Sequence, residues 1–251
     1  MMTCVLAREV RPSDVVGVGL GTPLALAACL LAKRLNAPDA TLLVGGAVSP
    51  RATLDECLHH DVAGRTPGYV PHLETMDMAE RQAMTLQFLR PAQVAGDGSA
   101  NTSRVEAGGK VVRFPGGLAL ADVPNLMPRI VLYHTAHEPR ALPAAIGFRT
   151  GAGGGIERAG YRAHGPTKLV TDLCVIAFAA AGPRLESVHP GVSVDEVVEA
   201  TGFDLDVDGA AETPPPSPSE LEALDAVDPS RRREIEIRRR RDATTEGSVR
   251  A

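Results

Sequence analysis

The segment DVVGVGLGTP (residues 14–23) joins a short β-prone run, a glycine-rich turn and a proline suited to the first turn of a helix. The segment from Leu24 to Leu35 is dense in Ala and Leu and predicts that helix. Ala37-Pro38-Asp39 ends it, and Ala40 to Val44 is a second apolar strand that stops at Gly45-Gly46. The order predicts a β-α-β unit. Because both strands are apolar almost throughout, we expect an α/β protein with an open, mainly parallel sheet covered by helices.

Length and composition narrow the class of protein. The chain has 251 residues and a mass of 26.3 kDa, and 44% of its residues are hydrophobic, which excludes a disordered or fibrous protein. A net charge of -5 and a pI of about 5.8 give no general attraction to phosphate backbones, so nucleic acid is not an expected partner. The 25 Gly and 20 Pro residues favour short strands and many loops over a helical bundle.

The cysteines and the N-terminus bear on the cellular compartment. No CxxC pair occurs among the four cysteines: Cys4, Cys29, Cys57 and Cys174. Their apolar or helical surroundings predict buried, reduced, structural thiols. Arg8 and Glu9 come too early for a secretory signal, and the most apolar run, Pro23 to Ala32, is about half as long as a membrane span requires. The sequence therefore predicts a cytoplasmic protein with no membrane partner.

Further elements follow along the chain. Residues 49–78 are rich in His, Pro and Asp and predict irregular structure, whereas Ala79 to Leu89 predicts a helix. Strand candidates follow, separated by glycine turns: Lys110 to Phe114, Arg129 to His134, and Lys168 to Phe178. Val192 to Thr201 predicts a helix with Ser193 as its cap.

The composition changes in the last part of the chain. We expect residues 1–212 to form the α/β domain and residues 213–251 to form a Pro-rich spacer with a charged helix or tail, because Pro214 to Ser219 is a stiff segment. Arg231 to Arg233 and Arg238 to Arg241 are basic clusters. Eight acidic residues balance the eight Arg of this region, so a solvated helix with a frayed end is favoured over phosphate recognition.

Two glycine-rich segments resemble phosphate-binding loops. Gly17-Val18-Gly19-Leu20-Gly21 lies between a strand and a helix, but a dinucleotide fingerprint needs a further glycine where Thr22 stands. Backbone N–H groups at this helix N-terminus predict either a pocket for an oxyanion or carbonyl oxygen, or a plain tight turn. Gly151 to Gly155 lacks the lysine of a phosphate loop, and a flexible loop is expected there.

The histidines do not predict a metal site. His134, His137 and Glu138 follow a strand, where a spacing of three does not place both imidazoles on one face. We expect the following to be loop residues: His59, His60 and His72. A catalytic triad cannot be assembled either, because no Gly-x-Ser-x-Gly segment and no reactive-cysteine context occur.

A series of short motifs follows in a fixed order over about residues 14 to 180, with Asp228-Pro229 beyond them. In chain order they are Gly19-Leu20-Gly21-Thr22-Pro23, Ala37-Pro38 before a strand, Phe88-Leu89, Gln93-Val94, Gly98, Asn101-Thr102, Pro115-Gly116-Gly117, His137-Glu138-Pro139-Arg140 and Val170-Thr171-Asp172-Leu173. No single motif is specific. In this order and spacing they resemble the β subunit of class I coenzyme A transferases, in particular the glutaconate-transferase-like branch.

One position departs from that resemblance. In the transferases the strand after Ala-Pro delivers a Glu that attacks the acyl-CoA thioester and forms a covalent intermediate. Here Leu42-Leu43-Val44 leads into Gly45, which stands where the resemblance places the Glu. Glycine has no nucleophilic group, so covalent acyl transfer through this position is not expected. Its missing side chain leaves room for a bulkier acyl group or a water molecule.

With this departure the sequence looks most like the heteromeric ring-opening hydrolases of bacterial steroid (cholesterol) catabolism, which keep the transferase fold but use water on a cyclic oxo acyl-CoA thioester. The resemblance implies a homologous α subunit that carries the key carboxylate, in a heterodimer or an α2β2 heterotetramer. It implies no catalytic residue in this chain, no metal, and no cofactor besides the coenzyme A of the substrate.

The implied chemistry needs a base for the water and donors for the developing negative charge. The groups of this chain that we expect at the substrate are Gly19, Gly21, Gly45, Gly46, Gln93, Asn101, Gly116 and Gly117. For Gln93 and Asn101, hydrogen bonds that merely fix a loop are an equal alternative.

Two other functions stay open. A true CoA transferase would need its nucleophile elsewhere, and Glu74 and Glu138 are the candidates. A non-catalytic acyl-CoA-binding module is the second, because transferase-like folds also serve as sensing domains of transcription regulators. Those carry a fused helix-turn-helix, and nothing before Asp14 is long enough to form one.

Overall fold

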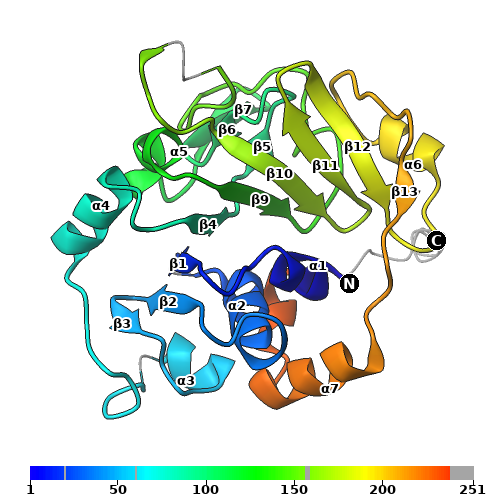
Figure 1. Cartoon of the computed structure of the whole chain (residues 1–251). Coiled ribbons are helices and arrows are strands. Elements are labelled where there is room, and N and C mark those ends of the chain that lie inside the picture. Colours follow the sequence, from blue (N-terminus) through cyan, green and yellow to red (C-terminus); the bar gives the residue numbers. More distant parts are fainter. Residues whose placement is uncertain (20, 60, 156–158, 238–251) are drawn as a thin grey trace, which may run out of the picture.

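A mixed sheet forms the centre of the computed structural model, which describes residues 1–19, 21–59, 61–155 and 159–237 (Figure 1). In this part of the chain nine strands form the sheet in the order β13-β12-β11-β10-β9-β4-β1-β2-β3. Its parallel centre consists of β10 (Pro166–Thr171), β9 (Ile130–His134), β4 (Leu86–Leu89), β1 (Val15–Val18) and β2 (Thr41–Val44). The expected open, mainly parallel α/β sheet is confirmed.

Shorter or antiparallel strands extend this centre. The antiparallel strands are β3 (Ala47–Val48), β11 (Cys174–Ala179) and β12 (Gly182–Val188), and β13 (Ala211–Glu212) runs parallel to β12. Two small hairpins lie apart from the sheet: β5 (Gln93–Val94) with β6 (Ala100–Asn101), and β7 (Arg104–Ala107) with β8 (Lys110–Arg113).

The chain reverses its direction of travel across the sheet at β1. From β1 it passes through α2 (Pro23–Leu35) to β2 on one side, and later returns to β4, β9 and β10 on the other. The carboxyl ends of β1 and β4 therefore flank a topological switch point. In open α/β sheets this is the place where loops diverge and leave a crevice for ligands.

Helices cover both faces of the sheet. On one face lie α1 (Met2–Arg8), α2, α3 (Leu54–Leu58), α7 (Pro218–Val227) and the 3-10 helix η3 (Arg232–Glu236). The second buried cluster draws on α4 (His72–Glu80), α5 (Val123–Leu126) and α6 (Val194–Glu199), and the 3-10 helix η1 (Leu118–Ala121) leads into α5. Strand β9 shows why both layers form: Val131 and Tyr133 join the first cluster, whereas Ile130 and Leu132 join the second.

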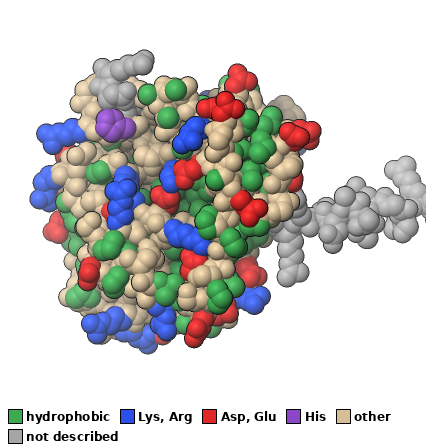
Figure 2. Space-filling model, turned by 45° about the vertical axis from the view of Figure 1, so that its right-hand side comes forward, with side chains coloured by type: hydrophobic (Ala, Val, Ile, Leu, Met, Phe, Trp, Pro, Cys, Tyr) green, Lys and Arg blue, Asp and Glu red, His purple; other side chains and the backbone are tan. Residues whose placement is uncertain are grey.

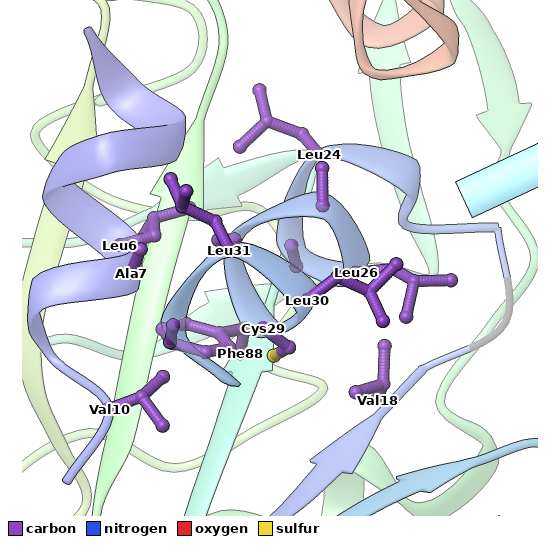
Figure 3. Packing of buried hydrophobic residues seen from close by; sticks show 14 of the residues in the cluster. Leu6, Ala7, Val10, Val18, Leu24, Leu26, Cys29, Leu30, Leu31 and Phe88 are labelled. Carbon is purple, nitrogen blue, oxygen red and sulfur yellow. The ribbon is translucent and has the colours of Figure 1, made fainter. Parts of the chain in front are cut away.

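Helix α2 is deeply buried, because apolar side chains surround it. Its residues 23–32 are all buried. Figure 3 shows Leu31 beside Leu6 and Ala7 of α1, and Cys29 near Phe88 of the sheet, all within one hydrophobic cluster. Such a helix is fixed rigidly, and so is its first turn.

The expected helix over 79–89 is wrong. Helix α4 ends at Glu80, and the chain then forms strand β4. The side chains of Met84, Leu86 and Phe88 are buried while Thr85 and Gln87 are half-buried, which is the period of two of a strand. Parallel partners on both sides decide in favour of the strand, since β4 pairs with β1 and β9.

Two further expectations need correction. The single strand expected over 168–178 is a pair, β10 and β11, because the Thr171 hydroxyl accepts hydrogen bonds from the N–H groups of Leu173 (3.2 Å) and Cys174 (3.1 Å) and turns the chain. Residues 49–78 are not irregular throughout. They contain α3, closed by a capping box between Thr53 and Glu56, and the start of α4.

Other expected elements are confirmed. Strands β8 and β9 lie within the ranges expected at 110–114 and 129–134. Ser193 caps α6 by accepting a hydrogen bond from the Glu196 N–H at 3.1 Å. All four cysteines are free and buried. No described helix is long and apolar enough to cross a membrane, and Figure 2 shows acidic and basic side chains among hydrophobic ones on the same face.

Residues 213–236 pack against the α/β layers. The spacer is fixed at Arg8, which donates to the Pro214 (2.7 Å) and Pro215 (3.0 Å) carbonyls and forms an ion pair with Glu220. Helix α7 is not simply solvated, because it buries three side chains on the α1–α2 layer: Ala223, Leu224 and Val227. Arg232 and Arg233 pair with Asp55 and Asp228. The cluster Arg238 to Arg241 lies outside the described residues.

Candidate active site

A cleft of about 690 Å³ opens at the switch point of the sheet. Three loops that follow the carboxyl ends of parallel strands line it, with Gly21 and Thr22 after β1, Arg90 to Gln93 after β4, and His134 to Ala136 after β9. The remaining lining residues come from the small hairpins and the following loops: Thr102, Val105, Glu106, Phe114, Pro115, Gly116, Glu138, Arg140 and Ala141. Size and position are those of a small-molecule site.

A buried carboxylate lies behind this cleft. The Glu236 side chain is only 3% exposed. Its Oε1 accepts a hydrogen bond from the Leu24 N–H at 3.0 Å, and its Oε2 accepts one from the Tyr133 hydroxyl at 3.0 Å. Burial raises the pKa of Glu236, although the Leu24 N–H, Arg90 and Tyr133 act against this shift. Burial and the neighbouring Glu236 raise the pKa of Tyr133 well above its ordinary value, so the phenol keeps its proton and donates it.

This carboxylate occupies part of the anion site expected at the N-terminus of α2. Leu24, in the first turn of the helix, gives its N–H to Glu236 of the same chain. The preceding turn closes on itself, because the Thr22 hydroxyl donates to the Gly19 carbonyl at 2.6 Å and Gly21 adopts a φ of +72°. The helix N-terminus therefore holds an internal anion.

Arg90 connects the buried carboxylate to the cleft. It directly follows β4 and lines the cleft, with 37% of its side chain exposed. Its Nε lies 3.4 Å from Glu236 Oε2. The other arginine of the lining, Arg140, is 67% exposed and pairs with Glu138. The cleft thus combines one anchored guanidinium with one exposed ion pair.

The structure brings only some of the expected substrate-binding residues together. Gly21, Gln93 and Gly116 line the cleft. The expected residues that do not line it are Gly19, Gly45, Gly46, Asn101 and Gly117.

Asn101 fixes a loop. It is fully buried, and its Nδ2 donates to the Gln93 side-chain oxygen and to the Arg104 carbonyl, both at 2.8 Å. Its Oδ1 accepts from the Ser103 N–H at 3.0 Å. Gln93 in turn donates from Nε2 to the Arg140 carbonyl at 3.2 Å. These bonds connect the β5–β6 hairpin to the cleft and leave Gln93 as the amide that borders it.

Gly45 and Gly46 form the two-residue turn of the β2–β3 hairpin. Their φ values are +55° and +89°, a pair that L-residues other than glycine rarely adopt together. A Cβ on Gly46 would lie 2.8 Å from the Val70 carbonyl oxygen. Gly45 stands at the carboxyl end of β2, at the same edge of the sheet as the cleft. No side chain projects there from this position.

The two alternative nucleophiles lie in different places. Glu74 is on the exposed surface of α4 and does not line the cleft. Glu138 does line it, with 35% of its side chain exposed, and forms an ion pair with Arg140. Glu106, on the exposed hairpin strand β7, also borders the cleft.

The histidines of this region have local partners. His137 is buried between two hydroxyl groups, with Nδ1 2.9 Å from Thr171 Oγ1 and Nε2 2.8 Å from Thr201 Oγ1, and burial lowers its pKa to about 4. His134 Nδ1 is 2.8 Å from the Ala136 carbonyl oxygen. Over the described residues, no group of three or more His, Cys, Asp or Glu is placed to hold a metal ion.

Sequence reasoning missed Arg90, Tyr133 and Glu236. Apolar and polar residues alternate over residues 84–88, which is the signal of a strand. This signal would have placed Arg90, which directly follows β4, at the carboxyl edge of the sheet. Tyr133 lies within the expected strand. Glu236 carried no local signal, because its partners come from residues more than 100 positions away.

The fold is that of a CoA-transferase subunit. No protein-family model matches the sequence. The chain is 28% identical to the β subunit of glutaconate CoA-transferase from Acidaminococcus fermentans, over 91% of each chain, and the solved structure of that enzyme superposes with a TM-score of 0.81 and 25% identity. By sequence and fold together, the chain is similar to the β subunits of CoA-transferases.

Two further solved structures share this fold. The decarboxylase AibA/AibB matches with a TM-score of 0.84 and 26% identity, covering 94% of this chain and 96% of that one. IpdAB of Rhodococcus jostii RHA1 matches in fold with a TM-score of 0.80 and 21% identity, over 95% and 97% of the two chains. Homologues are thus subunits of heteromeric complexes, as the two-part names of these proteins indicate.

Proposed function

We propose that this chain is the β subunit of a heteromeric enzyme that opens the ring of a cyclic oxo acyl-CoA thioester with water, in steroid catabolism. The observation that carries the proposal is Gly45. At the carboxyl end of β2, where the transferases that the sequence resembles have a nucleophilic Glu, this chain has a tight glycine turn without a side chain. The chain therefore supplies no acyl acceptor at that position.

The chemistry suits a 3-oxo thioester, in which one carbon separates the ketone carbon from the thioester carbonyl carbon. Water adds to the ketone, and the bond between the former ketone carbon and the carbon next to the thioester then breaks. The electron pair goes to the thioester enolate, which takes up a proton, and the ketone carbon becomes a carboxylic acid. In our proposal an α subunit supplies the base, and this chain supplies the wall of the pocket and donors near Gly21, Gln93 and Gly116.

One related structure supports a reaction other than transfer. A related structure belongs to a decarboxylase, and decarboxylation also breaks a carbon–carbon bond. The fold is therefore compatible with carbon–carbon cleavage as well as with CoA transfer.

The test uses this chain co-expressed and co-purified with a CoA-transferase-type α subunit. A cyclic 3-oxo acyl-CoA, in which the thioester carbonyl is attached to C2 of a cycloalkanone, is incubated in ¹⁸O-labelled water. We expect one ¹⁸O atom in the new carboxylate of an open-chain CoA thioester, and no exchange of CoA with added free acids. Rapid CoA exchange together with a glutamyl-CoA adduct on this chain, detected by mass spectrometry, would contradict the proposal.

A second candidate, a true CoA transferase, is favoured by one observation: Glu138 lines the cleft. If Glu138 were its nucleophile, Glu138→Gln would abolish CoA exchange, and borohydride would trap the adduct at this residue. Under our proposal the same variant retains ring opening, and the exposed Glu74→Gln serves as the matched control.

A further inference from the structure

Arg90 has donors that the described part of the chain does not use. The contact with Glu236 involves Nε, at 3.4 Å. Within the described residues, the terminal groups Nη1 and Nη2 make no hydrogen bond, although the side chain lines the cleft. A guanidinium carries five N–H donors in a rigid plane, and the two terminal groups account for four of them. They are available to an oxyanion that enters the cleft.

The orientation of this guanidinium is fixed from behind. Glu236 is held by the Tyr133 hydroxyl and the Leu24 N–H, both at 3.0 Å, and both partners belong to rigid elements of the sheet and of α2. A buried carboxylate with three partners has little freedom to move. Arg90 is therefore attached at Nε to a fixed point, and its remaining donors are preorganised.

The other cations near the cleft differ from Arg90. Arg140 pairs with Glu138 and is 67% exposed, so solvent screens its charge. Arg104 stacks over the Phe148 ring, 5.0 Å from its centroid, and does not line the cleft. Apolar residues that line the same cleft, among them Pro91, Ala92 and Phe114, leave less water to compete for its donors.

We propose that Arg90, positioned by Glu236, binds an anionic oxygen group of the acyl-CoA substrate and thereby determines which thioesters the cleft accepts. Two sources offer this chemistry: a carboxylate at the distal end of the acyl group, and a phosphate of coenzyme A. The inference rests on the proposed function, because it requires that an acyl-CoA enters this cleft. Arg90 is the group that contacts the ligand, and Glu236 is a positioning residue.

The experiment is titration calorimetry on the complex with its α-type subunit. Two probes differ only at the distal end: glutaryl-CoA ends in a carboxylate, and pentanoyl-CoA has a methyl group there. Each is titrated into the native complex and into complexes with Arg90→Gln, Arg90→Lys, Glu236→Gln and Arg140→Gln. Thermal melting of every variant complex establishes that it is folded.

Each variant has an expected result. In Arg90→Gln we expect an affinity loss of about tenfold or more, the usual effect of removing a charge-assisted hydrogen bond. The loss is confined to glutaryl-CoA if the distal carboxylate is the ligand, and affects both probes equally if a phosphate is. Arg90→Lys restores part of the affinity, because it keeps the charge. Glu236→Gln shows the same pattern at about threefold, and Arg140→Gln changes neither affinity.

Two outcomes overturn the inference. The first is native affinity for both probes in a folded Arg90→Gln complex, and the second is a loss that follows Arg140→Gln instead. Failure of the proposed function has a different signature, because it shows as CoA exchange without ring opening in labelled water, whatever the affinities of the Arg90 variants. If Arg90→Gln does not fold, Arg90→Lys and Glu236→Gln still decide, since native affinity for both probes in these two variants would equally overturn the proposed contact.

Discussion

Tyr133 and Glu236 are 103 positions apart in the sequence, and the Tyr133 hydroxyl donates a hydrogen bond of 3.0 Å to the Glu236 carboxylate. One residue belongs to β9 in the middle of the sheet, and the other to η3, the last described helix. A second contact strengthens this connection, because the Thr135 hydroxyl donates to the Glu236 carbonyl at 2.7 Å. The end of the described chain is thus fixed directly behind the cleft.

Removing the phenol hydroxyl tests this connection. We expect Tyr133→Phe to lower the free energy of unfolding by about 1–2 kcal/mol, because a buried carboxylate oxygen loses its donor. Urea denaturation followed by circular dichroism measures the change. Tyr161→Phe is the matched control, since Tyr161 is 45% exposed, and a change of the same size in both variants would contradict the interpretation.

Helix α7 is predicted to stabilise the α1–α2 layer. Leu224→Ala removes a side chain that is 5% exposed within the larger core cluster, so we expect a loss of about 2–3 kcal/mol in the free energy of unfolding. Leu221→Ala, three positions earlier and 49% exposed, is expected to change it by less than about 0.5 kcal/mol. Equal effects in urea denaturation would mean that α7 does not pack on α2.

The Gly45-Gly46 turn has a structural requirement of its own. Gly46→Ala places a Cβ 2.8 Å from the Val70 carbonyl oxygen at a φ of +89°, and we expect a loss of about 2–3 kcal/mol in the free energy of unfolding. Gly64→Ala is the control, because its φ is +71° and no atom lies within 4 Å of the added Cβ. Its expected loss is about 1 kcal/mol, measured by the same denaturation assay.

His137 makes stability depend on pH. Burial lowers its pKa to about 4, below the ordinary value of 6.5, so the unfolded chain takes up this proton more readily than the folded one. The contribution of uncharged His137 to the free energy of unfolding is therefore fully present above pH 6.5, and it is lost as the pH falls from 6.5 to about 4. The loss amounts to roughly 3 kcal/mol.

Denaturation curves at several pH values measure this effect. His137→Gln should flatten the pH dependence between 6.5 and 4 but not remove it, because burial also lowers the pKa of His189. An unchanged slope in His137→Gln would show that His137 is not the group that titrates.

Local patterns predicted those parts of the fold in which the spacing of apolar residues agrees with the glycines and prolines that end an element. The strand, glycine turn and helix of residues 14–35 are one case, because apolar run, glycines and Pro23 all indicate the same boundaries. Residues 79–89 failed because Ala and Met favour a helix locally, whereas pairing with β1 and β9 imposes a strand. Only the tertiary neighbours decide such a segment.

The candidate site was predictable to a smaller degree. Of the expected substrate-binding residues, Gly21, Gln93 and Gly116 line the cleft, and their role at a substrate stays a prediction. Arg90 was missed because residues 79–89 were predicted to form a helix instead of ending in strand β4. Glu236 was missed because its partners lie far from it in the sequence. A long-range hydrogen bond has no periodicity, so pattern analysis has nothing to detect.

The position of Glu236 in the chain also sets the order of events during synthesis. Every residue that lines the cleft, from Gly21 to Ala141, leaves the ribosome before residue 236 does. Until then the Leu24 N–H and the Arg90 guanidinium lack their internal counter-ion, so the nascent cleft is more positive than the finished one. The cleft therefore reaches its final charge distribution only after η3, which does not line the cleft, has been synthesised.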